Sequence, residues 1–333
     1  MLLSLAAKLQ QTLGILHKRD IQTAATMLLH DSTEAAIPVG DDCAAIPDGD
    51  GYLLLAAEGI LPALVGAEPW FAGWCSVLVN VSDIYAMGGR PIAVVDALWS
   101  QSTDDSKPLW EGMKAASRVF NVPIVGGHTN CHSPYNALSV AILGRAQRLL
   151  TSFGAQPGDG LLLVANPRGR MHPHYPFWDA ATQVDPAILR ANLELLPQLA
   201  EAGLCDTAKD ISMGGIVGTL MMLLETSGCG AVLDLDAVPC PVDVPLDAWL
   251  VAFPSYGFLL SVRPEQVQAV QAQFHNQDLI CAPIGQICDR PTLVLKTATE
   301  SMEFWDFTKA DLTGFSAHRS PHLSSTHPPS TTS

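Results

Sequence analysis

The sequence predicts an α/β protein of two domains, and three observations support this fold class. The chain has 333 residues, and single hydrophobic cores stop growing at roughly 250 to 300 residues. Strand-like apolar runs alternate with helical periodicity through both halves. A turn-rich segment, GAQPGDG at residues 154–160, separates these halves. We therefore expect a first domain over residues 1–150 and a second over residues 151–300.

The first half begins with helical spacing and continues into alternating strands and helices. Apolar residues at helical spacing predict two short helices within residues 1–30. The run YLLLAAEGI predicts a strand that ends near Glu58, and residues 70–87 predict a buried helix that Gly88 and Gly89 terminate. The remaining expected elements are the strand PIAVVDALW, a helix over residues 106–120, the strand VPIVGG, and a strand over residues 137–146.

The second half repeats this alternation and ends in a polar tail. Its expected elements are the strand LLLVA, helices around residues 186–203 and 213–227, the strands AVLDL and GFLLSV, a helix over residues 264–276, and two closing strands. From about Ser301 the periodicity is lost, and the chain ends in SAHRSPHLSSTHPPSTTS. Because this composition cannot form a packed core, we expect residues 301–333 to be a disordered tail.

Composition and charge exclude several classes of function. Eighteen Lys and Arg residues against 33 Asp and Glu residues give a net charge of −15, which argues against a nucleic-acid partner. The apolar runs are too short or too interrupted to cross a membrane, and no secretory signal is recognised. The eight cysteines are scattered without a CxxC pair, which is typical of reduced thiols in the cytoplasm. A small phosphorylated ligand is compatible with this charge if metal ions screen it.

One acidic residue lies where an acid is unfavourable. The segment VLVNVSDIYAMGG carries Asn80 and Asp83 in an otherwise apolar helix, and helical spacing places them on one stripe with Met87. An ionised carboxylate in such a place needs a hydrogen-bond donor, a cation or a solvent-filled cleft. A structural pairing with a local donor and a role in ligand binding both remain open.

Three further acids have the pattern of a magnesium site. Asp41 and Asp42 are adjacent in VGDDCAAI, and Glu58 lies where an apolar strand ends. Mg²⁺ takes oxygen ligands and is usually held by one or two carboxylates together with substrate phosphates. A solvated turn is the alternative explanation for the adjacent pair.

Two glycine-containing segments are candidates for contacts with phosphate. VGGHTN carries Gly126 and Gly127 after a strand, where the backbone would approach a phosphate closely, and His128 would bind a ligand or polarise a carbonyl. A tight turn and a structural histidine explain the same residues. In KDISMGG a loop opens into a helix, so that anions would be attracted to the helix end; an ordinary capped helix is the alternative. The candidates here are Lys209, Asp210 and Gly214.

The segment RGRMHPHYPFWDA concentrates positive charge in this acidic chain. Arginine binds carboxylate or phosphate through two hydrogen bonds, so the segment predicts a site for an anionic substrate. An ordinary surface loop is the alternative. The four candidates are Arg168, Arg170, His172 and His174.

These motifs together resemble those of a known superfamily. GDDCAAI, NVSDIYAMGGRP, VGGHT, AQPGD and DISMGG occur in the same order in the aminoimidazole-ribonucleotide (AIR) synthetase superfamily, over about residues 38–290. That superfamily includes thiamine-monophosphate kinase, selenophosphate synthetase and a hydrogenase-maturation protein. Overall, the chain is most similar to the AIR synthase-related branch rather than to any member with an established substrate.

The resemblance implies a fold, a cofactor and a set of site residues. It implies a two-domain PurM-like fold, with an N-terminal mixed sheet that forms the interface of a homodimer, and Mg·ATP held by acidic residues in a cleft. By motif, it implies metal binding by Asp41, Asp42, Glu58, Asp83 and Asp210, and a catalytic role for Asp83, His128 and Asp210. The residues expected to contact the nucleotide are Asn80, Gly126, Gly127, Lys209 and Gly214.

The departures from the family pattern leave two hypotheses. Thiamine-monophosphate kinase has the sequence TTD where this chain has AAE, which ends at Glu58. This chain has GGHT where the kinase has GGDT. Met213 stands where the DxSDG motif has its last acid. The Cys and Lys pair that selenophosphate synthetase uses in an N-terminal glycine-rich loop is not found. The first hypothesis is ATP-dependent phosphorylation, or activation by phosphorylation, of a small anionic metabolite. The alternative is a nucleotide-binding regulatory or partner protein without turnover.

Overall fold

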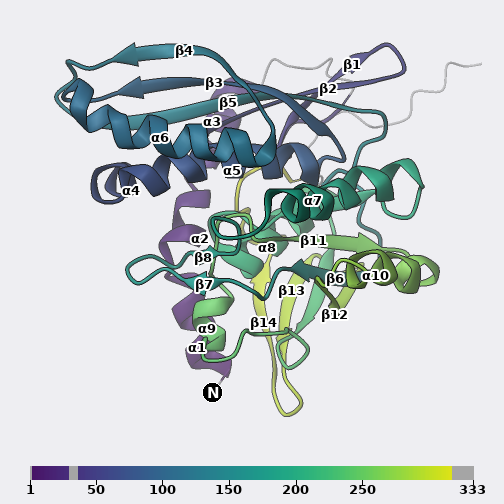
Figure 1. Cartoon of the computed structure of the whole chain (residues 1–333). Helices are drawn as coiled ribbons and strands as arrows, with labels where there is room; N and C mark the ends of the chain where they lie inside the picture. The colour runs from purple at the N-terminus through teal and green to yellow at the C-terminus, as the bar shows by residue number, and fades with distance from the viewer. Residues whose placement is uncertain (1, 30–36, 317–333) are drawn as a thin grey trace, which may run out of the picture.

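The computed structural model describes residues 2–29 and 37–316. They form two β-sheets with helices packed between them. A five-stranded sheet of the first half lies in the upper part of Figure 1, and a seven-stranded sheet of the second half lies in the lower part. Among the described residues, no helix is both long enough and apolar enough to span a lipid bilayer.

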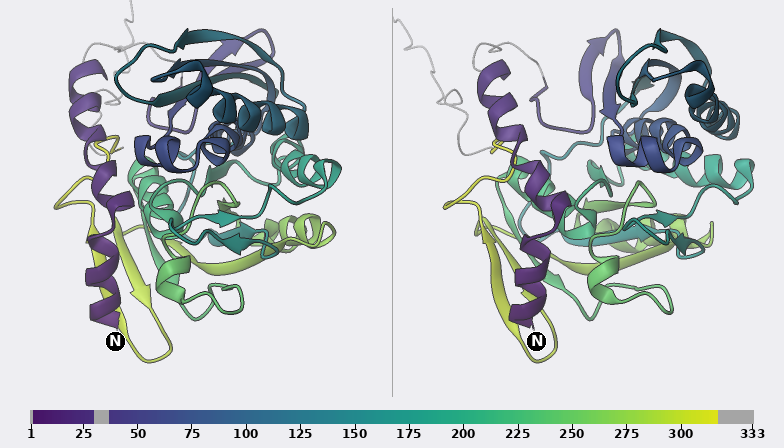
Figure 2. Two further views of the ribbon diagram at one scale, coloured as in Figure 1. Left: turned by 60° about the vertical axis from the view of Figure 1, so that its left-hand side comes forward. Right: turned by 90° about the vertical axis from the view of Figure 1, so that its left-hand side faces the viewer.

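The N-terminal segment forms three helices instead of the expected two. These are α1 (Leu2–Gln10), α2 (Leu13–Lys18) and α3 (Ile21–Leu29). The break between α1 and α2 lies at Thr12, whose backbone is extended at φ −69° and ψ 139°. The three helices form one column beside the last strands of the second sheet (Figure 2), where the Gln10 side chain donates to the Phe304 carbonyl at 2.9 Å.

The first sheet is mixed and has the strand order β1-β2-β5-β3-β4. Its strands are β1 (Ala44–Asp48), β2 (Gly51–Gly59), β3 (Arg90–Trp99), β4 (Ile124–Asn130) and β5 (Ala137–Ala146). All neighbours are antiparallel except β3 and β4, which run parallel. The lower face of this sheet in Figure 1 is covered by α4 (Pro62–Ala67), α5 (Pro69–Ala86) and α6 (Thr103–Phe120).

Helix α5 lies at the centre of the molecule, as the sequence predicts. It is buried nearly all round from Ala72 to Ala86, and it ends at Gly88, whose φ of 73° only glycine adopts readily. Close packing against α6 depends on two glycines: a Cβ on Gly73 would lie 2.1 Å from the Leu109 carbonyl oxygen, and one on Gly112 would lie 1.9 Å from that of Trp70. The helix therefore has fixed neighbours on all sides, and Asp83 cannot move out to bulk water.

The second sheet has the order β14-β13-β10-β12-β6-β11-β9. Its strands are β6 (Gly160–Ala165), β9 (Thr207–Asp210), β10 (Gly230–Asp234), β11 (Gly257–Val262), β12 (Ile280–Cys288), β13 (Thr292–Lys296) and β14 (Ser301–Asp306). The helices of this half are α7 (Pro186–Glu201), α8 (Gly215–Ser227), α9 (Leu246–Trp249) and α10 (Val267–His275), with a 3-10 turn at Pro264–Gln266. Strand β9 was not expected, since the sequence around Asp210 reads as a loop.

The expectation of a disordered tail over residues 301–333 is wrong for its first part. Strand β14 pairs antiparallel with β13, so three strands close the sheet rather than two. The chain then continues to residue 316 over the buried carboxylate of Glu225, which accepts backbone N–H groups of Leu312 at 2.7 Å and Thr313 at 2.8 Å. Residues 317–333 lie outside the described part of the chain.

Candidate functional site

Three carboxylates from separate parts of the sequence converge between the two domains. Asp42 precedes β1, Asp83 lies on α5, and Asp210 ends β9. Each offers an oxygen, and these oxygens lie within 4.8 Å of one another. Because α5 belongs to the first domain and β9 to the second, the packing of one domain on the other creates this group.

The carboxylates of Asp83 and Asp210 are buried without enough partners. Asp83 Oδ2 and Asp210 Oδ1 have no hydrogen-bond partner among the described residues. Burial, followed by the nearby carboxylates, raises the pKa of Asp83 well above its usual range and that of Asp210 to about 7. Asp210 Oδ2 is oriented by Ser255, whose hydroxyl donates to it at 2.7 Å. The free oxygens therefore require a proton or a cation.

Lys209 is the buried cation beside this group, but its charge is already paired. Its ammonium forms an ion pair with Asp42 and lies 3.6 Å from Asp41 Oδ1. Burial disfavours the charged form of Lys209, but the two aspartates outweigh that effect and raise its pKa. Lys209 thus holds Asp42 and also lines the cavity described below, and its expected contact with nucleotide stays a prediction.

Asp41 is separate from the three converging acids, although it was expected to bind metal with them. Its Oδ2 accepts the Ser152 N–H at 2.6 Å, and its Oδ1 accepts the Asp42 N–H at 2.9 Å. These bonds fix the loop before β1, and Asp41 also lines the cavity described below, so its expected metal role stays a prediction. Asp41 therefore positions Asp42 in this structure.

A cavity of about 360 Å³ opens above the carboxylates. Its size lies within the usual range for small-ligand sites. Glu58 lines the cavity from β2, close to the acids with which it was expected to lie. The half-buried Lys18 lines the cavity from α2. The opposite domain supplies Phe177, Phe253 and Ser255. Acids, cations and apolar side chains thus face one space.

The glycine segment after Pro123 does not join this cavity. Gly126, Gly127 and His128 lie within the edge strand β4, where they are exposed, rather than in a loop after it. A Cβ on Gly127 would lie 2.3 Å from Asp96 Oδ1 on the neighbouring strand, so packing explains this glycine. In the single chain, the catalytic role expected of His128 and the phosphate contacts expected of the two glycines have no geometric support.

Asn80 and Gly214 were also expected to contact the nucleotide. Asn80 is fully buried on α5, donates to the Ser76 carbonyl at 2.8 Å and does not line the cavity. Gly214 is the N-cap of α8 with a φ of 110°, next to Ser212 and Met213, which do line the cavity. Asn80 thus packs within the helix, whereas Gly214 shapes the backbone at the cavity edge.

The basic segment forms a separate site from the acids. It contains the short strands β7 (Arg170–Met171) and β8 (Trp178–Asp179). Arg168 and Arg170 line their own cavity and lie near Asp278 at 3.7 Å and Asp179 at 3.4 Å, respectively. The expected histidines lie elsewhere: His172 stacks on Phe71 at 5.5 Å between ring centroids, and His174 donates its backbone N–H to His172.

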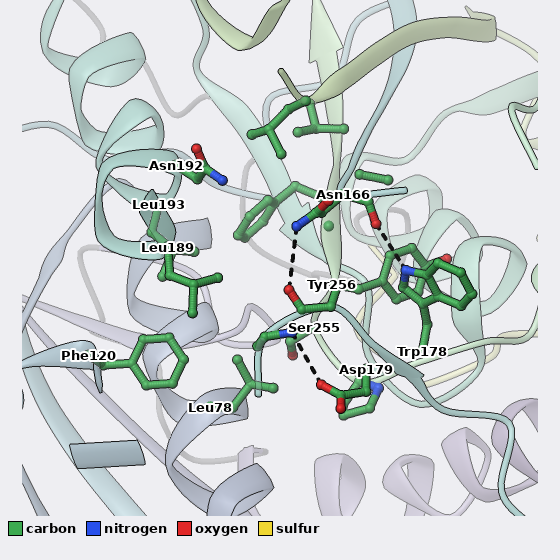
Figure 3. Close-up of a pocket in the computed structure, with 18 of the residues that line it drawn as sticks. Leu78, Phe120, Asn166, Trp178, Asp179, Leu189, Asn192, Leu193, Ser255 and Tyr256 are labelled. Atoms are coloured by element: carbon green, nitrogen blue, oxygen red, sulfur yellow. Dashed lines mark hydrogen bonds between the residues drawn. The ribbon is translucent and has the colours of Figure 1, made fainter. Parts of the chain in front are cut away.

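Figure 3 shows the lining of a third, mostly apolar cavity of about 60 Å³. Ser255 lines both this cavity and the acidic one, and Asn166 and Asp179 line both this cavity and the basic one. In Figure 3 the Trp178 indole donates to the Asn166 carbonyl at 2.9 Å, while Asn192 on α7 makes no hydrogen bond with the residues drawn. The three cavities therefore adjoin one another in a row.

Ser255 and Lys18 are two polar residues of the acidic cavity that were not among the predicted site residues. Ser255 belongs to no motif, because it reaches Asp210 only through the pairing of β9 with β11. Lys18 lies at the end of an amphipathic N-terminal helix, where a lysine is common, and its place in the cavity depends on how α2 packs. Only the charge of Lys18, in a chain with few cations, was available as a signal.

Comparisons with known proteins cover both domains. The N-terminal domain model of AIR synthase related proteins matches residues 40–146, and the C-terminal domain model matches residues 156–297. A protein of Synechocystis sp. that is described as uncharacterized is 60% identical over 320 residues, which is 95% of this chain and 99% of that protein. A protein of Methanocaldococcus jannaschii with the same description is 35% identical over 248 residues, or 74% of this chain and 76% of that protein.

Solved structures share the fold at low identity. PurL of T. maritima complexed with ATP superimposes with a TM-score of 0.71 at 19% identity, over 92% of this chain and 52% of that chain. AaThiL complexed with AMPPCP and TMP gives a TM-score of 0.64 at 19% identity, over 86% and 98% of the two chains. This chain thus spans about half the length of PurL.

Proposed function

The chain belongs to the AIR synthase-related family and has the expected PurM-like fold, and from this premise we propose that it is a magnesium-dependent, ATP-binding enzyme. The proposed reaction is phosphoryl transfer to a small anionic metabolite, or its activation by phosphorylation. The solved neighbours that were complexed with ATP or AMPPCP support the choice of nucleotide. The observation that carries the proposal is the pair of unpartnered buried oxygens, on Asp83 and Asp210, within one three-acid group.

The donor set suits magnesium. Mg²⁺ prefers oxygen ligands and is usually held by one or two carboxylates plus substrate phosphates. Asp42, Asp83 and Asp210 would hold the ion, and Glu58 faces the same cavity. When bound, magnesium would neutralise the charge of the phosphates and of the transferred phosphoryl group.

The protein's own residues would supply positioning. Asp41 and Lys209 hold Asp42 from two sides, and Ser255 holds one oxygen of Asp210, so the free oxygens of the group have fixed directions. Phosphoryl transfer requires little covalent chemistry from a protein, and orientation and charge neutralisation supply most of the rate. Phe177 and Phe253 line the same space, where their apolar side chains would limit the access of water.

We place the acceptor along the row of cavities that starts at Ser255. The apolar cavity would take an apolar part of the metabolite, and the basic cavity with Arg168 and Arg170 would take an anionic end. His172 and His174 are proposed as substrate residues because they lie in the same basic segment as Arg168 and Arg170. We also propose a cytoplasmic setting, since every cysteine in the described part of the chain is free.

We propose further that two chains form a homodimer through the first sheet. The face of this sheet opposite α5 and α6 exposes large apolar side chains on four strands, between 36% and 48% exposed. They are Ile46, Leu55, Val95 and Leu143. A contiguous apolar face of this kind is unusual on a monomer and supports self-association.

Calorimetric titration with ATP tests the metal-dependent binding. We expect binding in the presence of magnesium and none with excess chelator, because a cavity with several carboxylates repels bare triphosphate. Equal affinity under both conditions would contradict the proposal. ATP consumption, measured with and without a pool of small metabolites, then separates an enzyme from the alternative: binding without turnover under any condition favours a regulatory nucleotide-binding protein.

A further inference from the structure

One wall of the acidic cavity comes from parts of the chain outside both family-matched domains, which cover residues 40–146 and 156–297. Lys18 on α2 and Ile21 on α3 line the cavity from the N-terminal side. Thr313 and Phe315 line it from the C-terminal side. We call these four residues the terminal wall.

The terminal wall is tied to the rest of the molecule at several points. The Gln22 side chain donates to the carbonyls of Asp311 at 2.8 Å and Leu312 at 3.0 Å, which joins the N-terminal helices to the C-terminal segment. Phe315 packs so closely on Gly40 that a Cβ there would lie 2.6 Å from its ring. The wall is therefore built into the fold beside Asp41 and Asp42.

The packing of α2 directs Lys18 into the cavity. A Cβ on Gly14 would lie 2.5 Å from the Gly214 nitrogen, so the absence of a side chain lets α2 touch the start of α8. Lys18 follows Gly14 by four residues, and residues four apart lie on one face of a helix. The face of α2 that meets α8 therefore also presents Lys18 to the cavity, as its place in the lining confirms.

Lys18 differs from the other lysine of the cavity in its pairing. Lys209 is fixed by Asp41 and Asp42, whereas Lys18 makes no ion pair with any residue in the described ranges. Its long-range attraction is to Glu58, Asp210 and Asp42. A half-buried ammonium without a direct partner is available to a ligand, and the ligand class that suits it is an anion.

We propose that Lys18 binds a phosphate group in the acidic cavity, so that the terminal wall completes the site formed by the two family domains. This inference rests on the proposed function, in which magnesium and phosphate meet at the three acids. The phosphate is either the terminal one of the nucleotide or that of a free or acceptor phosphate, and the chemistry at the ammonium is the same.

The test is calorimetry on Lys18→Met, which removes the charge and keeps the length of the side chain. Three titrations are made with magnesium: ADP, AMPPCP, and inorganic phosphate added to the ADP complex. The matched control is Lys8→Met, which removes the same charge from an exposed site on α1, and Lys18→Arg should restore part of the binding. Lys18→Gln repeats the test should methionine disturb the fold, which thermal melts detect.

We expect a loss of about 10-fold or more in one phosphate titration, the range for a hydrogen bond to a charged group. Weaker AMPPCP binding with unchanged ADP binding assigns Lys18 to the terminal phosphate of the nucleotide. Weaker phosphate binding to the ADP complex alone assigns it to a free or acceptor phosphate. If all three titrations match wild type, the role of Lys18 is overturned while the proposed function stands. If wild type binds neither nucleotide, the proposed function itself fails, and this inference with it.

Discussion

Two buried aspartates, one in each domain, have opposite surroundings. Asp159 is 2% exposed and accepts the Ser261 hydroxyl at 2.7 Å and the Gln156 N–H at 3.0 Å, and its carboxylate pairs with Arg263. Asp83 is 5% exposed, and its Oδ2 has no hydrogen-bond partner among the described residues. The fold thus supplies several partners for the carboxylate of Asp159 and none for Oδ2 of Asp83 among the described residues.

A third buried acid supports this distinction. Glu225 is 1% exposed and accepts bonds from the backbone of Leu312 and Thr313 and from the Thr313 hydroxyl. Asp159 and Glu225 are therefore structural carboxylates with partners of their own. An unpaired buried acid destabilises a fold. Because Asp83 lies beside two other acids and lines a cavity, we propose that a ligand compensates its charge.

The largest effect on stability is expected at the satisfied acid. Asp159→Ala leaves the Arg263 guanidinium without its buried partner, and we expect a loss of about 3 kcal/mol in the free energy of unfolding. Urea unfolding measures this, with Asp206→Ala as the control, because Asp206 pairs with the same arginine from an exposed position. A loss no greater than that of the control would show that Asp159 does not differ from a surface acid.

The pH dependence of stability sharpens the comparison, with a smaller effect. In the folded state the pKa of Asp83 is raised by burial and neighbouring acids, and that of Asp210 is raised to about 7. The unfolded chain ionises these groups near pH 4, so between pH 4 and 7 the folded state binds more protons and its stability falls as pH rises. Their contribution is unfavourable at neutral pH and vanishes in acid.

Thermal melts without metal check this contribution. In the double variant Asp83→Asn, Asp210→Asn, we expect the decrease in Tm between pH 5 and 7.5 to be smaller than in wild type by about 3 °C. Saturating magnesium should also make the decrease in Tm of the wild type smaller, because the bound cation would compensate the charge of the ionised aspartates. Identical pH profiles for wild type and the double variant would contradict the assignment of these acids as unsatisfied.

The sequence predicted the centre of the site better than its edges. Asp83 could be predicted because a charged residue in an apolar helix is a local anomaly. That Asp83 lies together with Asp42 and Asp210 was expected from the resemblance of their motifs to those of the superfamily. Strand β9 could not be predicted, because its sequence TAKD lacks the residues and the alternation typical of a strand. Its pairing with β11 is a contact between segments far apart in the sequence. The convergence itself depends on domain packing that no local pattern encodes.

Two segments have a local structure that differs from the one expected. Gly126 and Gly127 look like a phosphate loop by composition, but the neighbouring carboxylate of Asp96 requires a glycine in an ordinary strand. The tail expected from Ser301 contains the strand SMEFWD, which forms a hairpin with β13 directly before it, and the segment after this strand is anchored by Glu225, far away in the chain. Distant carboxylates, invisible to local sequence reasoning, thus decide the structure at Gly127 and around Thr313, whereas the hairpin of β13 and β14 is a local pairing that the sequence analysis missed.

The most direct test of the central claim is calorimetry of Mg·ATP binding to Asp83→Asn. We predict a loss of affinity of at least about 30-fold, which corresponds to about 2 kcal/mol, with an unliganded Tm equal to or above that of wild type. Asp96→Asn is the matched control, since Asp96 also has a buried oxygen without a partner in the described chain but lies outside the cavity. Wild-type affinity in Asp83→Asn would show that this acid is structural and contradict the account.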